Sequence, residues 1–317
     1  MNNRTKILIV GAGGRLGTAL LHEYRDKLDV IGLDHTQLDL TDFDRVRERL
    51  SPLDFNILIN CAAFTNVDLC EKEIDQAFRI NAEAPKLLAQ ICRDKKAKLI
   101  HFSTDYVFDG EKREPYVEND VAKPISVYGE SKREGEKSVL QTPSSFESAA
   151  STMTSLPAEG AAGQRPVRRH LVVRVSWVFG PDRPSFIDAV IKRASENDHV
   201  DAIVDKFSTP TYTRDIAKML PQFFDVDIEG GILHFANAGE CSWQEYAQHA
   251  LDSCRSLGIP LKAKTVGALK LADMKNWIAR RPVYSVLSTE KFFSLTGTTP
   301  RNWRDAVAEY VREFVAR

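Results

Sequence analysis

Two side chains four residues apart, Tyr128 and Lys132, offer the clearest chemistry in this sequence. If their segment is helical, the phenol and the ammonium lie on one face, one turn apart. An unperturbed tyrosine ionises near pH ~10, and a neighbouring positive charge lowers that pKa toward the working pH, where a proton donor is most effective. The hydroxyl of Thr104 is expected to hold a carbonyl oxygen against the hydroxyl of Tyr128. Such a site suits reduction of a ketone, or oxidation of an alcohol, beside a hydride source.

By itself this spacing is weak evidence, because tyrosine and lysine fall four residues apart by chance in many chains. An exposed tyrosine on a charged helix is the alternative. The amino terminus decides between the two. Residues 6–10 (KILIV) are typical of a strand buried on both faces in a parallel sheet, and Gly11, Gly14 and Gly17 follow at once in the pattern GxxGxxG. Such glycines let the backbone approach a pyrophosphate at a helix N-terminus, although a tight strand-to-helix turn needs similar residues.

The nature of the dinucleotide depends on two residues of opposite charge. A second strand over 30–33 ends at Asp34, close to the offset of ~20 residues at which an acid hydrogen-bonds the adenosine ribose. Asp34 favours a free 2′-hydroxyl and therefore NADH, whereas Arg15 in the glycine loop is placed to pair with a 2′-phosphate. We therefore expect a cofactor that is NADPH or NADH.

The segments between these motifs predict an α/β fold. Strands are expected over 55–60, 98–102 and 171–175, a helix opening at Asp39, and one or two helices over 67–94. Strands that alternate with helices indicate a doubly wound parallel sheet of Rossmann type, with its site at the carboxyl ends of the strands.

The domain boundaries follow from the same pattern. We expect a dinucleotide-binding domain over 1–178, with a mobile, loop-like insertion at 141–168, completed by 210–238. A smaller C-terminal substrate-binding lobe is expected from 179–209 and 239–317. Trp177 follows a strand and either stacks on a substrate ring or packs between domains. The acids at 68, 71, 73 and 75 are interpreted as a solvated face, and Arg280 and Arg281 as a phosphate site or a solvated basic turn.

Composition narrows the partners. The chain has 317 residues, 43% of them hydrophobic, and a net charge of −1, so no overall basic field points to nucleic acid or to a membrane surface. The five cysteines are scattered and never spaced CxxC, which argues against a disulfide framework and a zinc site. We expect a cytoplasmic protein without a membrane span or a bound metal.

Longer motifs carry a resemblance that covers nearly the whole chain. The sequence resembles the dTDP-4-dehydrorhamnose reductase family of the extended short-chain dehydrogenase/reductase superfamily. The motifs are NCAAFTNVD (60–68), STDYVFDG (103–110), YGESKREGE (128–136), RVSWVFG (174–180), the segment 207–211 and RPVYSVLSTEKF (281–292). The resemblance implies NAD(P)H-dependent reduction of the 4-keto group of a nucleotide-linked deoxysugar in dTDP-rhamnose biosynthesis. It leaves a homodimer open.

The same resemblance implies roles for individual residues. Tyr128 would be the proton donor, Lys132 would hold the nicotinamide ribose, and Thr104 would polarise the carbonyl. Arg15, Phe64 and Ser208 depart from the family's usual residues. The implied dinucleotide contacts are Gly11, Gly14, Arg15, Leu16, Gly17, Asp34, Asp39, Leu40, Ala63, Phe64 and Thr65, and the implied sugar contacts are Val67, Thr104, Asp105 and Trp177.

Two other functions share this fold. One is a non-catalytic, dinucleotide-binding regulatory subunit resembling the β subunit of methionine adenosyltransferase, which keeps similar segments. The other is a nucleotide-sugar epimerase or dehydratase. A dehydratase is expected to place an acid pair beside the catalytic threonine, and here Asp105 is followed by Tyr106. Trp177 fits the reductase better than the regulatory subunit.

Overall fold

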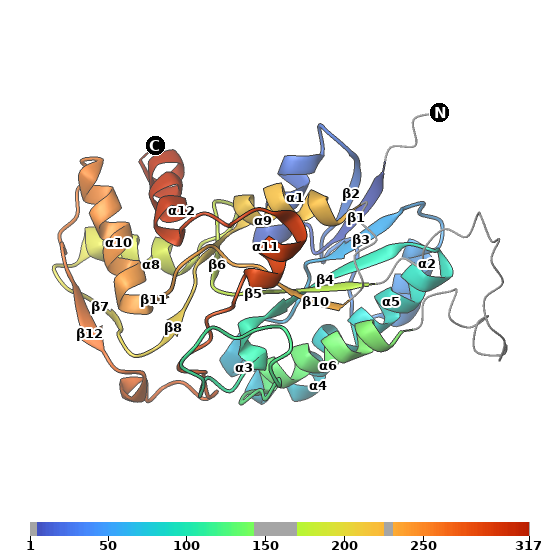
Figure 1. Cartoon of the computed structure of the whole chain (residues 1–317), viewed down its shortest axis with the longest axis horizontal. Helices are drawn as coiled ribbons and strands as arrows, with labels where there is room; N and C mark the ends of the chain where they lie inside the picture. The colour runs from blue at the N-terminus through green and yellow to red at the C-terminus, as the bar shows by residue number, and fades with distance from the viewer. Residues whose placement is uncertain (1–4, 143–169, 225–230, 317) are drawn as a thin grey trace.

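The computed structural model describes residues 5–142, 170–224 and 231–316 (Figure 1). Its centre is a six-stranded sheet in which every neighbouring pair of strands is parallel. This confirms the predicted doubly wound α/β fold. In spatial order the strands are β10 (Gly231–His234), β5 (Leu171–Val175), β4 (Lys98–Thr104), β3 (Ile57–Asn60), β1 (Lys6–Val10) and β2 (Asp29–Leu33).

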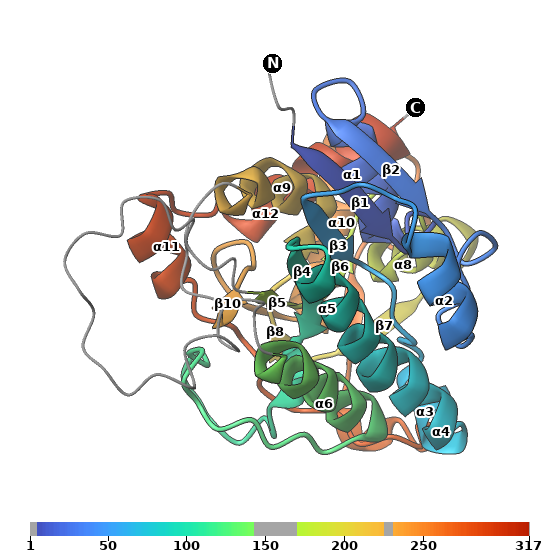
Figure 2. The same cartoon turned by 90° about the vertical axis from the view of Figure 1, so that its right-hand side faces the viewer.

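Helices cover both faces of this sheet (Figures 1 and 2). Alternate residues of β1 show the consequence: Ile7 and Ile9 pack into one apolar cluster, and Leu8 and Val10 into another on the opposite face. This accounts for the continuous apolar run, since a strand covered on both sides has no polar face. One face carries α1 (Arg15–Tyr24), α9 (Thr213–Met219) and the turn η3 (Leu220–Phe223), and the other carries α2 (Phe43–Leu50), α5 (Ala84–Asp94) and α6 (Val127–Gln141).

Two helix starts show how the sequence sets local structure. The predicted helix opens at Asp42 and not at Asp39, because the side chain of Asp42 accepts from the amide of Arg45 at 3.0 Å and caps α2. The prediction of one or two helices over 67–94 is borne out in outline. The segment is a nearly continuous helical path of α3 (Val67–Lys72), α4 (Ile74–Phe78), the π-helical turn η1 (Arg79–Glu83) and α5.

A third apolar cluster lies at the other end of the molecule, around Trp303, Tyr246 and Phe179, where α8 (Phe186–Glu196), α10 (Trp243–Ser256) and α12 (Trp303–Tyr310) lie in Figure 1. The predicted domain boundaries remain a prediction, and one segment crosses them: Phe292 of α11 (Glu290–Thr296) packs into the core of the sheet. The other elements of this end are β6 (Val178–Phe179), β7 (Val200–Ile203), β8 (Phe207–Ser208), β9 (Thr211–Tyr212), β11 (Cys241–Ser242), β12 (Val266–Leu269), η4 (Leu271–Asp273) and η5 (Val311–Val315).

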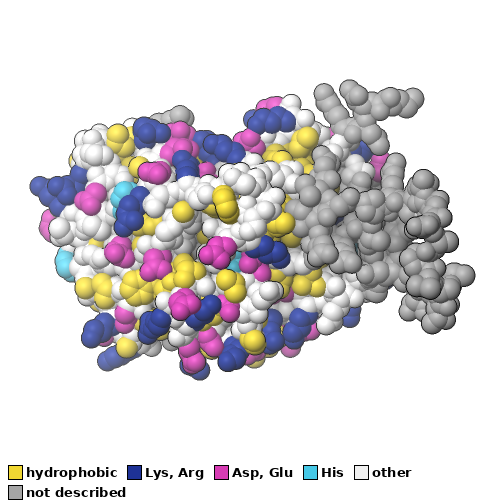
Figure 3. All heavy atoms as spheres, in the orientation of Figure 1, with side chains coloured by type: hydrophobic (Ala, Val, Ile, Leu, Met, Phe, Trp, Pro, Cys, Tyr) yellow, Lys and Arg dark blue, Asp and Glu magenta, His cyan; other side chains and the backbone are white. Residues whose placement is uncertain are grey.

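The predicted insertion at 141–168 falls almost wholly on residues 143–169, which lie outside the described residues. On the face shown in Figure 3, basic and acidic side chains of the described residues are interspersed. No helix of the described residues is long and apolar enough to cross a membrane.

Candidate active site

The glycine turn after β1 is built for close contacts. Gly11 has a φ of +80°, and a Cβ there would lie 2.6 Å from the amide nitrogen of Ala62. A Cβ at Gly17 would lie 2.2 Å from the carbonyl oxygen of Gly11, so only glycine lets α1 start against the turn. Gly14 caps α1 without a side-chain hydrogen bond. The amides of the first helical turn are therefore left for a ligand, and the cradle fits a pyrophosphate.

Asp34 stands beside this turn, as predicted. A Cβ at Gly13 would lie 3.1 Å from the Cβ of Asp34, which shows how close the two segments are. The carboxylate accepts from the hydroxyl and the amide of Thr36 at 2.6 and 2.9 Å. The hydrogen bond from the Thr36 side chain lowers the pKa of Asp34, so a negative charge stands where the adenosine ribose would lie.

Arg15 is turned away from that ribose position. Its guanidinium donates to the carbonyl oxygens of Val178 and Arg183, at 3.0 and 3.3 Å, and also to that of Pro184. Arg183 in turn donates to the carbonyl oxygen of Gly13 at 2.8 Å. Backbone carbonyls of the 178–184 segment bind the guanidinium in this structure, and the pairing of Arg15 with a 2′-phosphate stays a prediction.

The other residues predicted to contact the dinucleotide differ in how far they are buried and in what they bind. Leu40 is buried in the core under β1, and Leu16 is partly buried against the opposite cluster. The Asp39 carboxylate is bonded to the amide and hydroxyl of Thr41 at 2.9 and 2.8 Å. Ala63, Phe64 and Thr65 follow β3, and the side chain of Asn81 binds both the amide and the carbonyl of Phe64.

Tyr128 and Lys132 lie in α6, and both are buried. The helix starts at Ser126, whose hydroxyl accepts from the amide of Gly129 at 3.3 Å. A Cβ at Gly129 would lie 2.2 Å from the carbonyl oxygen of Tyr106, so glycine lets α6 approach the end of β4 closely. The Tyr128 ring packs edge-on against Tyr106, with centroids 5.6 Å apart. The phenol therefore lies at the carboxyl end of the sheet.

Thr104, the last residue of β4, brings a hydroxyl to the same point. Its oxygen donates to the Asp105 carboxylate at 3.1 Å and accepts from the amide of Tyr106 at 3.2 Å. Burial raises the pKa of Tyr128, and a hydrogen bond with Thr104 opposes that rise. Burial is the largest effect, so the pKa of Tyr128 is raised, and the predicted lowering of this pKa toward the working pH is not found.

The Lys132 side chain lies behind the phenol. Its Nζ donates to the carbonyl oxygen of Phe102 at 2.8 Å and lies 3.3 Å from Nε2 of His101. Burial lowers the pKa of Lys132 to about 8. These contacts fix the amine against the carboxyl-terminal part of β4, in the same buried layer as Thr104.

Asp105 is more deeply engaged than the sequence indicates. Its carboxylate accepts from Ser285 at 2.5 Å and from Ser208 at 3.2 Å, in addition to Thr104. Burial raises the pKa of Asp105, and the positive charge of Lys206 opposes this rise. Three segments of the chain, around residues 104–105, 206–208 and 285, therefore meet at one carboxylate.

The two other residues expected to contact the sugar flank this junction. Val67 opens α3 and packs with Tyr106 and Tyr128. Trp177 has a φ of +40°, a region that bulky residues rarely adopt, and its Nε1 is buried without a partner among the described residues. The Nζ of Lys206 lies 5.6 Å from the Trp177 ring centroid and 5.1 Å from that of Tyr106.

Sequence reasoning missed the residues that come from afar. Lys206 donates to the carbonyl oxygen of Pro282 at 2.9 Å and is fully buried, although its position in the sequence gives no sign of this. The interpretation of Asp68 as solvated is wrong, because its carboxylate forms an ion pair with Arg281 at 2.8 Å. Glu71 was also assigned to that face, and it accepts from the amide of Val127 at 2.9 Å.

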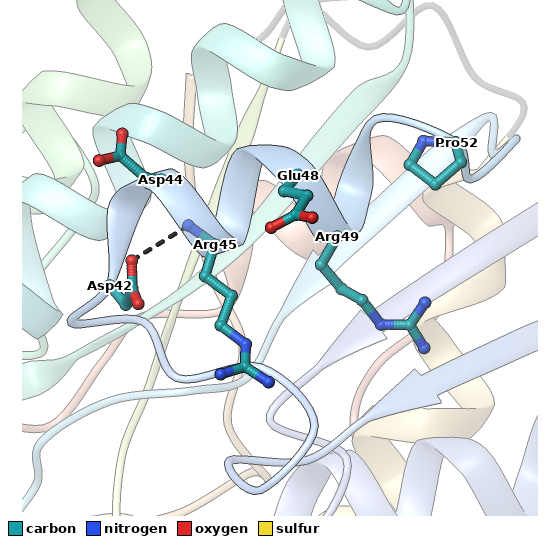
Figure 4. A pocket seen from close by; sticks show the side chains of 6 residues that line it. All are labelled: Asp42, Asp44, Arg45, Glu48, Arg49 and Pro52. Atoms are coloured by element: carbon teal, nitrogen blue, oxygen red, sulfur yellow. Dashed lines mark hydrogen bonds between the residues drawn. The ribbon is translucent and has the colours of Figure 1, made fainter.

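Hollows elsewhere on the surface are separate from this cluster. One of about 710 Å³ runs along α2, where Arg45 and Arg49 extend from the same side of the helix (Figure 4). It is lined by charged and exposed residues of a helix away from the end of β4. Among the described residues there is no group of three or more His, Cys, Asp or Glu side chains that would hold a metal ion.

A parallel sheet that brings a glycine turn, a buried Tyr-Lys pair and a threonine hydroxyl to its carboxyl edge defines a short-chain dehydrogenase/reductase. The family described as the RmlD substrate binding domain matches residues 5–148 and 153–316. The chain belongs to this family, whose relatives include the dTDP-4-dehydrorhamnose reductases.

Individual relatives agree with that membership. A dTDP-4-dehydrorhamnose reductase from Aggregatibacter actinomycetemcomitans is 32% identical over 309 residues, 95% of this chain and 97% of the relative. The spore coat polysaccharide biosynthesis protein SpsK from Bacillus subtilis (strain 168) is 32% identical over 310 residues, 98% of each chain. The crystal structure of dTDP-4-dehydrorhamnose reductase from Bacillus anthracis, in complex with NADP, has a TM-score of 0.84 at 28% identity and covers 98% of this chain and 99% of its own. The expected family and the expected class, an NAD(P)H-dependent oxidoreductase, are confirmed.

Proposed function

We propose that this sugar-nucleotide reductase acts on the 4-keto group of a nucleotide-linked deoxysugar, and that its substrate is dTDP-4-dehydro-L-rhamnose. The observation that carries the proposal is the position of the buried Tyr128 phenol next to the Thr104 hydroxyl at the carboxyl end of β4, close enough for Thr104 to act on the pKa of Tyr128. Two hydroxyls that lie this close together can bind the same carbonyl oxygen of a ligand. The names of the relatives support the choice of sugar.

Each side chain then has one task. Burial raises the pKa of Tyr128, which keeps the phenol protonated at neutral pH, and the phenol gives its proton to the substrate oxygen as negative charge develops there. The hydroxyl of Thr104 has a single proton, which it turns from the Asp105 carboxylate to the same substrate oxygen as a second hydrogen bond. Lys132, whose Nζ donates to the carbonyl oxygen of Phe102, would hold the nicotinamide ribose of the cofactor. Bound NADPH or NADH supplies the hydride.

The binding residues are assigned by position. The amides that follow Gly14 take the pyrophosphate, and Asp34 takes the adenosine ribose. Trp177 and Val67 border the sugar. Asp105 positions the Thr104 hydroxyl beside the sugar and does not bind the sugar directly, because its carboxylate oxygens already accept from protein hydroxyls.

The test is a panel of dTDP-, UDP- and GDP-linked 4-keto-6-deoxysugars, with oxidation of NADPH or NADH followed by absorbance. We expect turnover with dTDP-4-dehydro-L-rhamnose, and a loss of about 10²- to 10⁴-fold in kcat for Tyr128→Phe, the usual contribution of a general acid. Cofactor affinity, measured by fluorescence titration, should not change.

A matched control is Tyr212→Phe. Tyr212 is also a buried tyrosine, but its hydroxyl has no partner among the described residues, and the residue lies in the third apolar cluster, around Trp303. This variant should keep wild-type turnover. Full turnover by Tyr128→Phe, or a preference for a sugar without a 4-keto group, would contradict the proposal.

A further inference from the structure

The catalytic lysine is the last of three fully buried polar side chains that lie in a row, Asn60, His101 and Lys132. Nδ2 of Asn60 lies 3.1 Å from Nδ1 of His101, and Nε2 of His101 lies 3.3 Å from Nζ of Lys132. All three are buried, so their hydrogen bonds must be made within the row or with the backbone around it.

The first member of the row has a fixed orientation. The amide of Ala62 donates to Oδ1 of Asn60 at 3.1 Å. A backbone N–H can only donate, so Oδ1 must face Ala62 and the NH₂ group must face His101. The Ala62 peptide cannot easily turn, because it lies against Gly11 of the glycine turn, where an added Cβ would come within 2.6 Å of its nitrogen.

The orientation of Asn60 decides the tautomer of His101. The NH₂ group of Asn60 donates, so Nδ1 of His101 must accept. Burial lowers the pKa of His101 well below its usual value, and the nearby Lys132 charge lowers it further. The imidazole is therefore neutral, and its single proton is on Nε2, the nitrogen that faces Lys132.

This proton changes what Lys132 can do. A charged ammonium has only donors, so it would set an N–H against the N–H of His101. A neutral amine accepts from Nε2 and still donates to the carbonyl oxygen of Phe102 at 2.8 Å. The hydrogen bonds of the row are complete only when the lysine has lost its proton.

Other groups around the amine act in the opposite direction. Glu136 on the same helix and Cys61 after β3 both raise the pKa of Lys132. The Glu136 carboxylate also pairs with Arg174 at 2.7 Å, so the positive charge of Arg174 partly cancels the effect of Glu136 on the pKa of Lys132. Burial is the larger effect on the lysine, and His101 is the neighbour that presents a donor.

We propose that Asn60 and His101 are positioning residues for Lys132: they hold an N–H against its amine and thereby weaken its hold on its proton. The lysine then changes its charge within the range in which the enzyme works. The kinetic part of this inference rests on the proposed function, whereas the tautomer of His101 does not.

The experiment replaces Asn60 by aspartate, which is isosteric. In Asn60→Asp the carboxylate still accepts from Ala62, but it also accepts from His101, so the imidazole proton moves to Nδ1. Long-range ¹⁵N NMR of histidine, assigned with His101→Gln, should show the Nε2–H tautomer in the wild type and the Nδ1–H tautomer in the variant. The fall of kcat/KM on the alkaline side should move up by about one pH unit, which corresponds to about 1.4 kcal/mol.

The matched control is Asn56→Asp, the same change at the other end of β3, where the side chain accepts from the amide of Lys6 at 2.9 Å. It should change neither readout. An Nδ1–H tautomer in the wild type overturns the inference, and so does a pH profile that Asn60→Asp leaves in place. The wild-type tautomer can be read even if Asn60→Asp does not fold or if no nucleotide sugar is turned over, so failure of the proposed function is distinguished from failure of this inference.

Discussion

Replacing Glu136 by glutamine should destabilise the protein strongly, because Glu136 is half of a buried ion pair. Its carboxylate oxygens accept from Nε and Nη2 of Arg174 at 2.8 and 2.7 Å, and the two side chains are only 3% and 2% exposed. The pair joins α6 to β5. Glu136→Gln leaves one acceptor where there were two and leaves the guanidinium charge uncompensated.

The expected loss is about 3–5 kcal/mol, the usual cost of removing one partner from a buried pair. The groups that directly contact the Arg174 guanidinium besides Glu136 do not compensate its charge. Nε2 of His234 lies 3.3 Å from Nη1 of Arg174, but a histidine carries no negative charge in either protonation state and so cannot compensate the guanidinium. The ring centroid of Phe108 lies 5.0 Å from the guanidinium carbon. Adding Arg174→Met to Glu136→Gln should recover much of the loss, since no buried charge then remains.

Urea unfolding of the wild type, the single variant and the double variant measures these differences at constant m. The control is Glu134→Gln in the same helix, whose partner Lys137 lies 2.9 Å away at the surface. An exposed pair of this kind is worth at most about 1 kcal/mol. If Glu136→Gln unfolds within 1 kcal/mol of the wild type, the buried pair does not fasten α6 to the sheet as argued.

Two further predictions concern charge. Lys206→Met removes a buried ammonium whose pKa burial lowers to about 8, whereas an unfolded lysine titrates near 10.4. Between these values the unfolded chain binds more protons, so the stability of the wild type relative to the variant should rise by about 1.4 kcal/mol per pH unit. Urea titrations at pH 8.5 and 9.5 test this, and a constant difference would contradict it. Asp34→Ala removes a negative charge beside the glycine turn and should shift the ratio of kcat/KM for NADPH over NADH upward about tenfold. The control is Asp26→Ala at an exposed position. If Asp34→Ala leaves the ratio of kcat/KM for NADPH over NADH unchanged, Asp34 does not select the cofactor at the adenosine ribose.

The parts that the sequence predicts well are those fixed by neighbours in the chain. The run over 6–10, the glycines that follow and the spacing of Tyr128 and Lys132 each depend on one turn or one strand. Local periodicity and backbone sterics therefore suffice to place them. The parallel pairing of the strands follows from the same alternation of strands and helices.

The parts that could not be predicted depend on groups far away in the chain. The contact of the Arg15 guanidinium with the carbonyl oxygen of Val178, 163 residues later, could not be predicted. Asp68 looks solvated until Arg281 reaches it from 213 residues away. The pKa of Tyr128 follows the burial of the phenol, which no spacing of residues reveals. Pair patterns predict which groups share a helix face, but not what the tertiary fold excludes from water.

The position of Tyr128 follows from how α6 is held and not from the motif that contains it. Glu71 binds the first amide of the helix, at Val127, and Arg174 binds Glu136 near its other end. Between these points a Cβ at Gly135 would lie 2.1 Å from the carbonyl oxygen of Asn81, so the helix packs directly on backbone. A tyrosine and a lysine four residues apart on an unfastened helix would have the same sequence pattern but no fixed distance to Thr104. Because a displacement of about 1 Å can cost about 10²-fold in rate, these contacts are as necessary to the chemistry as the two side chains themselves.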